Sequence, residues 1–198
     1  MAIIESDKLL HWNYFLAVEE DLHRLSRFVD FSTANFNTYS IEMVRILFAA
    51  SAEVDVVAKQ LCEKIQPSRE AANIDHYRQI IKPHTPVLTM THVEIPRHGL
   101  TLNPWASWAE DLNPDWWKAY NSVKHRRSDH FHDANLKNTL NSVAGLFVIL
   151  LFFHREQAAA GELTPNPSML RLGAPFARDS LFWSHTGTFV YRLNEVSE

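Results

Sequence analysis

The feature that most limits the fold is an apolar run of eleven residues at positions 143–153, between Asn141 and His154. The run is shorter than the roughly 20 apolar residues that a membrane-spanning helix needs. We therefore interpret it as a buried helix in the core of a globular protein. The helical pattern around it extends from about residue 133 to residue 160, and Gly161 is a typical helix stop.

The length of 198 residues is that of one domain with one hydrophobic core. Hydrophobic residues make up 46% and charged residues 21% of the chain, which excludes the composition of a disordered protein. The single cysteine, Cys62, has no partner for an intramolecular disulfide, and we expect it to be a small core residue. We predict a helical body at residues 1–162 and a C-terminal tail at residues 163–198 that packs on the same domain.

The first residues, with Glu5 and Asp7, lack the basic start and apolar stretch of a signal peptide. Together with the single cysteine, this predicts a cytoplasmic protein with no membrane association. The 19 Lys and Arg residues against 23 Asp and Glu residues give a net charge of −4. The overall charge therefore does not attract nucleic acid, and any such contact requires a local basic patch.

Apolar residues at three- and four-residue spacing predict four helices before the apolar run. The first three cover residues 7–28, 40–65 and 69–81. Pro83 is expected to close the third, because proline interrupts the helical hydrogen bonds. The fourth begins with Asn113 as its cap and Pro114 in its first turn, and it ends near Arg127. With the helix at 133–160, the chain has about five helices.

Residues 86–108 differ from this helical pattern. Alternating β-favouring side chains stand at Val87, Thr89, Thr91, Val93 and Ile95. Pro96 and Gly99 interrupt the run, so we predict a short hairpin or an ordered loop. The tail has three prolines followed by a strand-like run at 181–191, and we expect irregular structure with one or two short strands. The predicted fold class is an all-α bundle with a small β-rich insertion and an irregular C-terminal tail.

The most unusual sequence covers residues 115–133, at the end of the fourth predicted helix. Four basic side chains in succession, at positions 124–127, are followed by His130 and His132. On a helix, Trp117, Asn121 and His125 share one face, and Tyr120, Lys124 and Arg127 share the adjacent face. The pattern predicts a polar, protonatable surface with basic neighbours.

The motif Tyr120-Asn121-x-x-Lys124-His125 resembles the Arg-Asn-x-x-x-His signature of the HEPN superfamily of helical bundles. The segment from Asn37 to Cys62 is similar to the second helix of bacterial HEPN-like proteins, so the resemblance covers residues 38–155. Here Tyr120 stands where the family has arginine. A looser match joins Arg126 and Arg127 to His132 as an Arg-x(4–6)-His pattern.

The resemblance implies two functions. Many HEPN proteins are metal-independent RNA-cleaving toxins or antiviral defence effectors, in which two copies of the motif meet across a homodimer. By that resemblance His125 is the acid/base residue, Asn121 positions the substrate, and Lys124 or Arg126 replaces the lost arginine as phosphate ligand. Tyr120 and Arg127 complete the candidate RNA-binding residues. The other function is a non-catalytic module that binds RNA, a nucleotide or a protein, which the replacement of arginine by Tyr120 favours.

Structural alternatives stand beside these hypotheses. Basic residues such as those at 124–127 are also typical of a helix C-terminus, where they interact favourably with the helix dipole. His125 is alternatively a structural histidine that forms hydrogen bonds. Trp116 and Trp117 are typical of a core or of an interface rather than of base stacking. Because aromatic side chains favour a partner surface, we also expect a homodimer with Trp116 or Trp117 at its interface.

Metal binding is the remaining chemical alternative. His125, His130, His132 and Asp133 are close in sequence, but their spacing matches no known zinc motif, so we expect neither a metal nor a cofactor. On the second predicted helix, the i,i+4 spacing pairs Asp55 with Lys59 as surface support. The partner of Glu53 stays open, and contact with Lys124 or Arg126 would connect it to the motif.

Overall fold

The computed structural model describes residues 9–175, 181–183 and 187–193. The described chain is mostly helical with a small β-sheet, which confirms the predicted class of a helical bundle with a β insertion. Its helices are α1 (Leu10–Leu25), α2 (Ile41–Ile65), α3 (Ile74–His84), α4 (Asp115–His125), α5 (Arg127–His130), α6 (Leu136–Phe153) and α7 (Arg155–Ala160). Its strands are β1 (Val93–Ile95), β2 (Leu100–Leu102), β3 (Arg171–Leu172), β4 (Leu181–Trp183) and β5 (Phe189–Tyr191).

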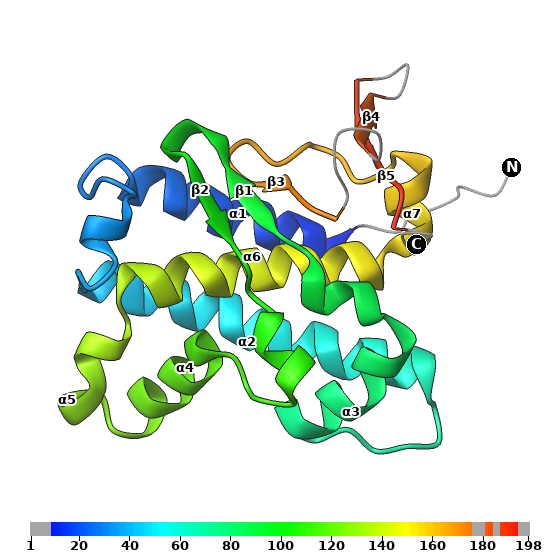
Figure 1. Ribbon diagram of the computed structural model, residues 1–198, viewed down its shortest axis with the longest axis horizontal. Coiled ribbons are helices and arrows are strands. Elements are labelled where there is room, and N and C mark those ends of the chain that lie inside the picture. Colours follow the sequence, from blue (N-terminus) through cyan, green and yellow to red (C-terminus); the bar gives the residue numbers. More distant parts are fainter. Residues whose placement is uncertain (1–8, 176–180, 184–186, 194–198) are drawn as a thin grey trace, which may run out of the picture.

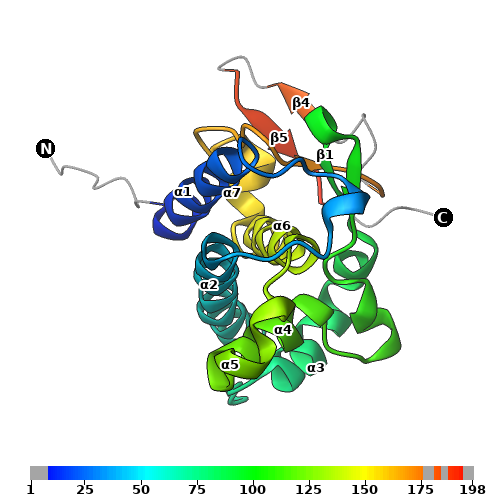
Figure 2. The same ribbon diagram turned by 90° about the vertical axis from the view of Figure 1, so that its left-hand side faces the viewer.

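Helix α6 lies at the centre of the molecule, as the apolar run predicts (Figures 1 and 2). Nearly all of its side chains are buried, including Leu146 and Leu150. The most extensive contact between two elements is the one between α2 and α6. By length and composition alone α6 could also cross a membrane, but 78% of it is buried inside the fold. It therefore has the environment of a core helix.

Helix α2 follows its prediction closely. Ser40 is its N-cap, and the side-chain hydroxyl accepts a hydrogen bond from the Met43 N–H at 3.1 Å. One apolar stripe of α2 faces the core, and Cys62 is buried within it. The first helix is shorter than the predicted 7–28 and extends from Leu10 to Leu25.

The third helix was predicted wrongly at both ends. It begins at Ile74, because the Asn73 side chain accepts hydrogen bonds from the N–H groups of Asp75 and His76. It continues past Pro83 to His84, where the Thr85 hydroxyl and N–H both donate to the Ile81 carbonyl. A cap on each side thus fixes α3, and the proline is accommodated in the last turn.

The fourth and fifth predicted helices are each divided. Helix α4 ends at His125 because Arg126 leaves the helical conformation, with φ −142° and ψ 61°, and the short helix α5 follows. A 3₁₀ turn, Phe131–Asp133, precedes α6, and His154 separates α6 from α7. Gly161 ends α7 in the left-handed conformation, with φ 70°, as predicted.

The Asn113 cap is a further correction at the start of α4. The N-cap position belongs to Pro114. The Asn113 side chain instead accepts a hydrogen bond from Arg78 and donates one to Asp75 at 3.2 Å. Asn113 therefore connects the segment before α4 to α3.

The predicted hairpin is present as β1 and β2, which pair antiparallel around Gly99 at φ 61°. Residues Pro86–Met90, predicted to be strand-like, form a 3₁₀ helix instead. Strand β3 from the tail adds to the other edge of β1, so the tail completes a three-stranded sheet. The remaining two strands, β4 and β5, form a separate antiparallel pair, and part of the predicted run at 181–191 lies outside the described residues.

The tryptophans are core residues of a single chain. Trp116 is 2% and Trp117 6% exposed, and they pack with Trp105 and Trp108 in one aromatic cluster. The Trp105 indole N–H donates to the Gly145 carbonyl at 3.1 Å, which joins the cluster to α6. Each ring is thus covered by its own chain, and the expectation that Trp116 or Trp117 lies at or near a dimer interface stays a prediction.

A buried carboxylate holds the tail on the bundle. Glu19 of α1 is 2% exposed and accepts hydrogen bonds from three consecutive backbone N–H groups, of Ser168, Met169 and Leu170, at 2.8–2.9 Å. The Ser168 hydroxyl donates to it as well, at 3.3 Å. This contact joins residues about 150 positions apart in the sequence, and it places β3 beside the hairpin.

We predict that Glu19→Ala lowers the free energy of unfolding by about 2–5 kcal/mol, because three backbone N–H groups, two of them buried, lose their acceptor. Urea denaturation measures this change. The control is Glu20→Ala, which removes an exposed carboxylate that pairs with Arg24, and it should change stability by less than about 1 kcal/mol. Equal losses from the two variants would show that Glu19 does not anchor the tail.

Candidate functional site

Helix α4 displays the motif residues as its periodicity predicts. Tyr120 is 8% exposed and faces α2, Asn121 is half-buried, and Lys124 and His125 are exposed at the helix end. The helix breaks at Arg126, so Arg126 and Arg127 continue the exposed basic surface into α5. We call Lys124, His125, Arg126 and Arg127 the basic cluster.

A pocket of about 270 Å³ lies beside the basic cluster, between α4, α2 and the start of α3. Its lining consists of Asp55, Ala72, Asn73, Ile74, Trp117, Tyr120, Asn121 and Lys124. The structure thus brings together three of the predicted site residues, Tyr120, Asn121 and Lys124. The other three predicted site residues are exposed and do not line the pocket: His125, Arg126 and Arg127. We call this the α4 pocket.

Sequence reasoning missed two polar residues of the α4 pocket. Asp55 was assigned to Lys59, but it accepts a hydrogen bond from the Tyr77 hydroxyl at 3.0 Å. Burial, together with the adjacent Asp55 charge, raises the pKa of Tyr77, so this hydroxyl stays a donor. Asn73 reaches the pocket because it caps α3, and the Asn-x-Asp capping pattern at 73–75 is a signal that was overlooked.

Two cations of the basic cluster lie next to aromatic rings. Phe48 of α2 meets Tyr120 edge-on at 5.3 Å between ring centroids. The Lys124 ammonium lies 5.3 Å from the Tyr120 ring centroid, and the Arg127 guanidinium lies 5.5 Å from the Phe48 ring centroid. Cations over ring faces are attracted by the ring quadrupole. The two cations are therefore held in place without an acidic partner.

The charges of the basic cluster are not neutralised by carboxylates. Other basic residues of the described chain form ion pairs, for example Arg45 with Asp21 and Lys118 with Asp115. Among the described residues, no ion pair includes a member of the basic cluster. In a chain of net charge −4, Lys124, Arg126 and Arg127 give this cluster a local patch of positive charge.

The histidines after the basic cluster contact one carboxylate. His130 Nδ1 lies 2.9 Å from Asp133 Oδ2, and His132 Nε2 lies 3.4 Å from Asp133 Oδ1. Within residues 9–175 and the two short described segments after them, no three His, Cys, Asp or Glu side chains are placed to bind a metal together. The contacts with Asp133 instead stabilise the turn before α6.

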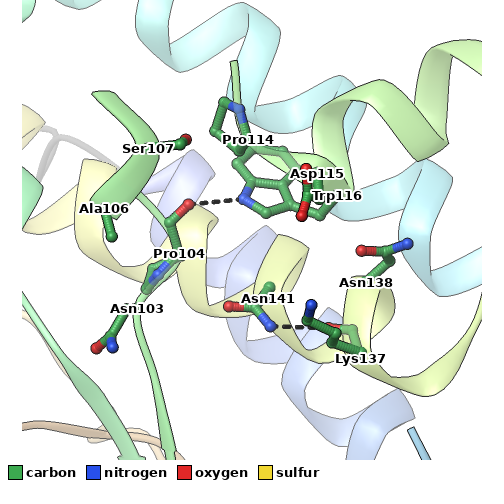
Figure 3. A pocket seen from close by; sticks show the side chains of 10 residues that line it. All are labelled: Asn103, Pro104, Ala106, Ser107, Pro114, Asp115, Trp116, Lys137, Asn138 and Asn141. Carbon is green, nitrogen blue, oxygen red and sulfur yellow. Dashed lines mark hydrogen bonds between the residues drawn. The ribbon is translucent and has the colours of Figure 1, made fainter. Parts of the chain in front are cut away.

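A second polar pocket, of about 240 Å³, lies on the other side of α4 and contains no residue of the motif. Figure 3 shows Trp116 at its back, with the indole N–H donating to the Pro104 carbonyl at 2.8 Å. Asn141 donates to the Lys137 carbonyl at 2.9 Å. The polar groups that could attract a ligand here are thus partly engaged within the protein.

Glu53 is not part of the α4 pocket. Its carboxylate lies 2.5 Å from His11 Nδ1, and the other ring nitrogen of His11 lies 3.2 Å from Gln60 Oε1. The partner that the sequence left open is therefore His11, and not Lys124 or Arg126. Glu53 joins the start of α1 to α2 instead.

Comparisons with protein-family models, with curated proteins and with solved structures gave no match for this chain. Function must therefore be inferred from the geometry of the site.

His154, at the junction of α6 and α7, is a buried titratable group outside the α4 pocket. Its Nε2 is buried without a hydrogen-bond partner. Burial lowers the pKa of His154 to about 4, and the positive charges of Lys64 and His11 act in the same direction. The folded protein therefore holds His154 neutral over a range in which the unfolded chain, with a histidine pKa of about 6.5, takes up a proton.

We predict that the fold loses stability through this group as the pH falls from about 6.5 to about 4, because protons then bind the unfolded state preferentially. Above pH 6.5 the effect vanishes. When the pH is lowered from 7.5 to 4.5, the free energy of unfolding of His154→Gln should rise by about 1–2 kcal/mol relative to that of the wild type, after allowance for solvent screening. Chemical denaturation at the two pH values measures the difference. His132→Gln, at an exposed site, is the control, and an equal gain from it would refute the assignment.

Proposed function

We propose that this protein is a non-catalytic, HEPN-like module that binds single-stranded RNA through the end of α4. The observation on which the proposal rests is the basic cluster, four consecutive exposed side chains that form no ion pair among the described residues. Unpaired Lys and Arg side chains bind phosphates and release the counterions of the nucleic acid. The order of the elements supports the resemblance, because the motif helix α4 is followed by the long core helix α6 after the short helix α5 and one 3₁₀ turn.

Aromatic side chains beside the basic cluster favour single-stranded RNA over a duplex. Tyr39 is 51% exposed and meets Phe131 edge-on at 5.6 Å. Phe131 packs on the same small apolar cluster as Phe48 and Tyr120, which support the basic cations. Exposed rings among cations allow bases to stack while the phosphates contact the basic side chains. Bases are available for stacking only when they are unpaired.

The α4 pocket has the size and the polar groups to hold one base. Asn73 and Asn121 provide amide groups, and Asp55 provides a carboxylate. Such groups form hydrogen bonds with base edges. Lys124 lies at the junction of the pocket and the basic cluster. A nucleotide would thus place its base in the pocket and its phosphate on the basic cluster.

The alternative function, a metal-independent endoribonuclease, has less support. A histidine that transfers protons is normally oriented by a second group. The hydrogen bonds of the described residues include none from the His125 side chain, and His125 does not line the α4 pocket. Tyr120, in the position of the family's arginine, is buried against Phe48 and Trp117. A phosphate ligand at that position is therefore missing.

The homodimer stays a proposal. Since the tryptophans are buried within one chain, the exposed apolar side chains are better candidates for a dimer interface. Ile41 and Val56 of α2 are exposed apolar side chains. A dimer across this face would bring two basic clusters into one RNA-binding surface.

The test is fluorescence anisotropy with a labelled single-stranded oligoribonucleotide in EDTA, over a series of salt concentrations. The triple variant Lys124→Gln, Arg126→Gln, Arg127→Gln should lower the affinity at least about tenfold. The slope of log affinity against log salt should fall by about 2, because each phosphate contact on a single strand contributes about 0.7. Lys118→Gln is the control, since Lys118 is exposed on the same helix but pairs with Asp115 at 3.2 Å.

The histidine variant distinguishes the two functions. If the protein only binds RNA, His125→Ala leaves the RNA intact and changes the affinity little. If it is a ribonuclease, the wild type cleaves the oligoribonucleotide in EDTA and His125→Ala loses about 10²–10⁴-fold in rate while still folded. An unchanged affinity in the triple variant, or an equal loss in Lys118→Gln, would contradict the binding proposal.

A further inference from the structure

A separate pocket of about 170 Å³ lies between α1, the turn of the β1–β2 hairpin and the tail. Its lining residues are His23, Pro96, Arg97, Ser168, Met169 and Arg171. Figure 2 shows these elements on one side of α6 and the helices α4 and α5 on the other side. We call this site the tail pocket, and it is independent of the proposed RNA-binding surface.

Two exposed arginines and a half-buried histidine line the tail pocket from three separate parts of the chain. His23 belongs to α1, Arg97 to the hairpin turn and Arg171 to β3. Among the described residues, neither Arg97 nor Arg171 forms an ion pair or a side-chain hydrogen bond. Like charges around one small space repel each other, so the arrangement favours an anion between them.

Two carboxylates lie near the tail pocket. Glu94 is the cross-strand partner of Arg171, with its Oε1 3.2 Å from the position that a β-carbon would take on Gly173, and it forms no ion pair with Arg171 among the described residues. Glu19 accepts the N–H groups of Ser168, Met169 and Leu170, and this contact fixes the segment just before Arg171. Within the described part of the chain, neither arginine of the tail pocket therefore pairs with a carboxylate.

We propose that the tail pocket binds the phosphate group of a small molecule. Guanidinium groups present paired N–H donors that match the oxygens of a phosphate, and Arg97 and Arg171 provide two such groups. The His23 imidazole adds a polar contact, whereas the Ser168 hydroxyl and N–H already donate to Glu19. Drug-sized ligands occupy about 300–1,000 Å³, so a pocket of 170 Å³ fits a phosphate with a small substituent.

The test is isothermal titration calorimetry of the intact protein with inorganic phosphate and with glycerol phosphate, at constant ionic strength in chloride. Both probes should bind to the wild type. Arg97→Gln and Arg171→Gln should each weaken binding about tenfold or more, because each loses a charge-assisted contact. Arg24→Gln is the matched control, since Arg24 is an exposed arginine of α1 that already pairs with Glu20 and Asp21.

Two further measurements keep the test decisive. Arg171→Lys retains the charge but not the paired donors, and it should weaken phosphate binding in a protein whose melting temperature is unchanged. A 5′-phosphorylated trinucleotide and its 5′-hydroxyl form show whether the phosphate belongs to RNA instead. The proposal is overturned if neither small phosphate binds better than chloride, if Arg24→Gln loses as much as Arg171→Gln, or if only the 5′-phosphorylated trinucleotide binds.

Discussion

The structure depends on the burial of α6. From Ser142 to Phe152 this helix is buried all round, so each side needs a cover. Helix α2 packs along one side, and α1, the tryptophan cluster and the small sheet cover the others. Helix α4 packs against both α6 and α2, and the contact of Phe48 with Tyr120 forms on the α2 side. The α4 pocket and the basic cluster are thus located by the covering of one apolar helix.

Much of this architecture follows from local patterns in the sequence. The periodicity of α2, the apolar run within α6, the hairpin around Gly99 and the stop at Gly161 were predicted, since each depends on neighbours in the chain. The same periodicity placed Asn121 and Lys124 close enough to share a pocket. Where a single residue interrupts a pattern, as Arg126 and His154 do, the prediction merged two helices into one.

The contacts that the sequence could not predict join distant segments. Asp55 and Asn73 reach the α4 pocket only because α3 packs on α2, and the local spacing of Asp55 to Lys59 suggested a different partner. Glu53 pairs with His11 from another helix. Glu19 meets backbone N–H groups, which no side-chain motif marks. Long-range polar contacts of this kind organise both the α4 pocket and the tail pocket.

The most direct test of the central claim, that RNA contacts the unpaired basic end of α4, is photocrosslinking of 4-thiouridine RNA with mass spectrometry of the attached peptides. The account predicts crosslinks within residues 117–132 and at Tyr39, which meets Phe131 of that segment. Crosslinks should disappear from both segments as salt is raised, because the phosphate contacts weaken. Crosslinks confined to the hairpin, to α7 or to the tail at saturating RNA would contradict the claim.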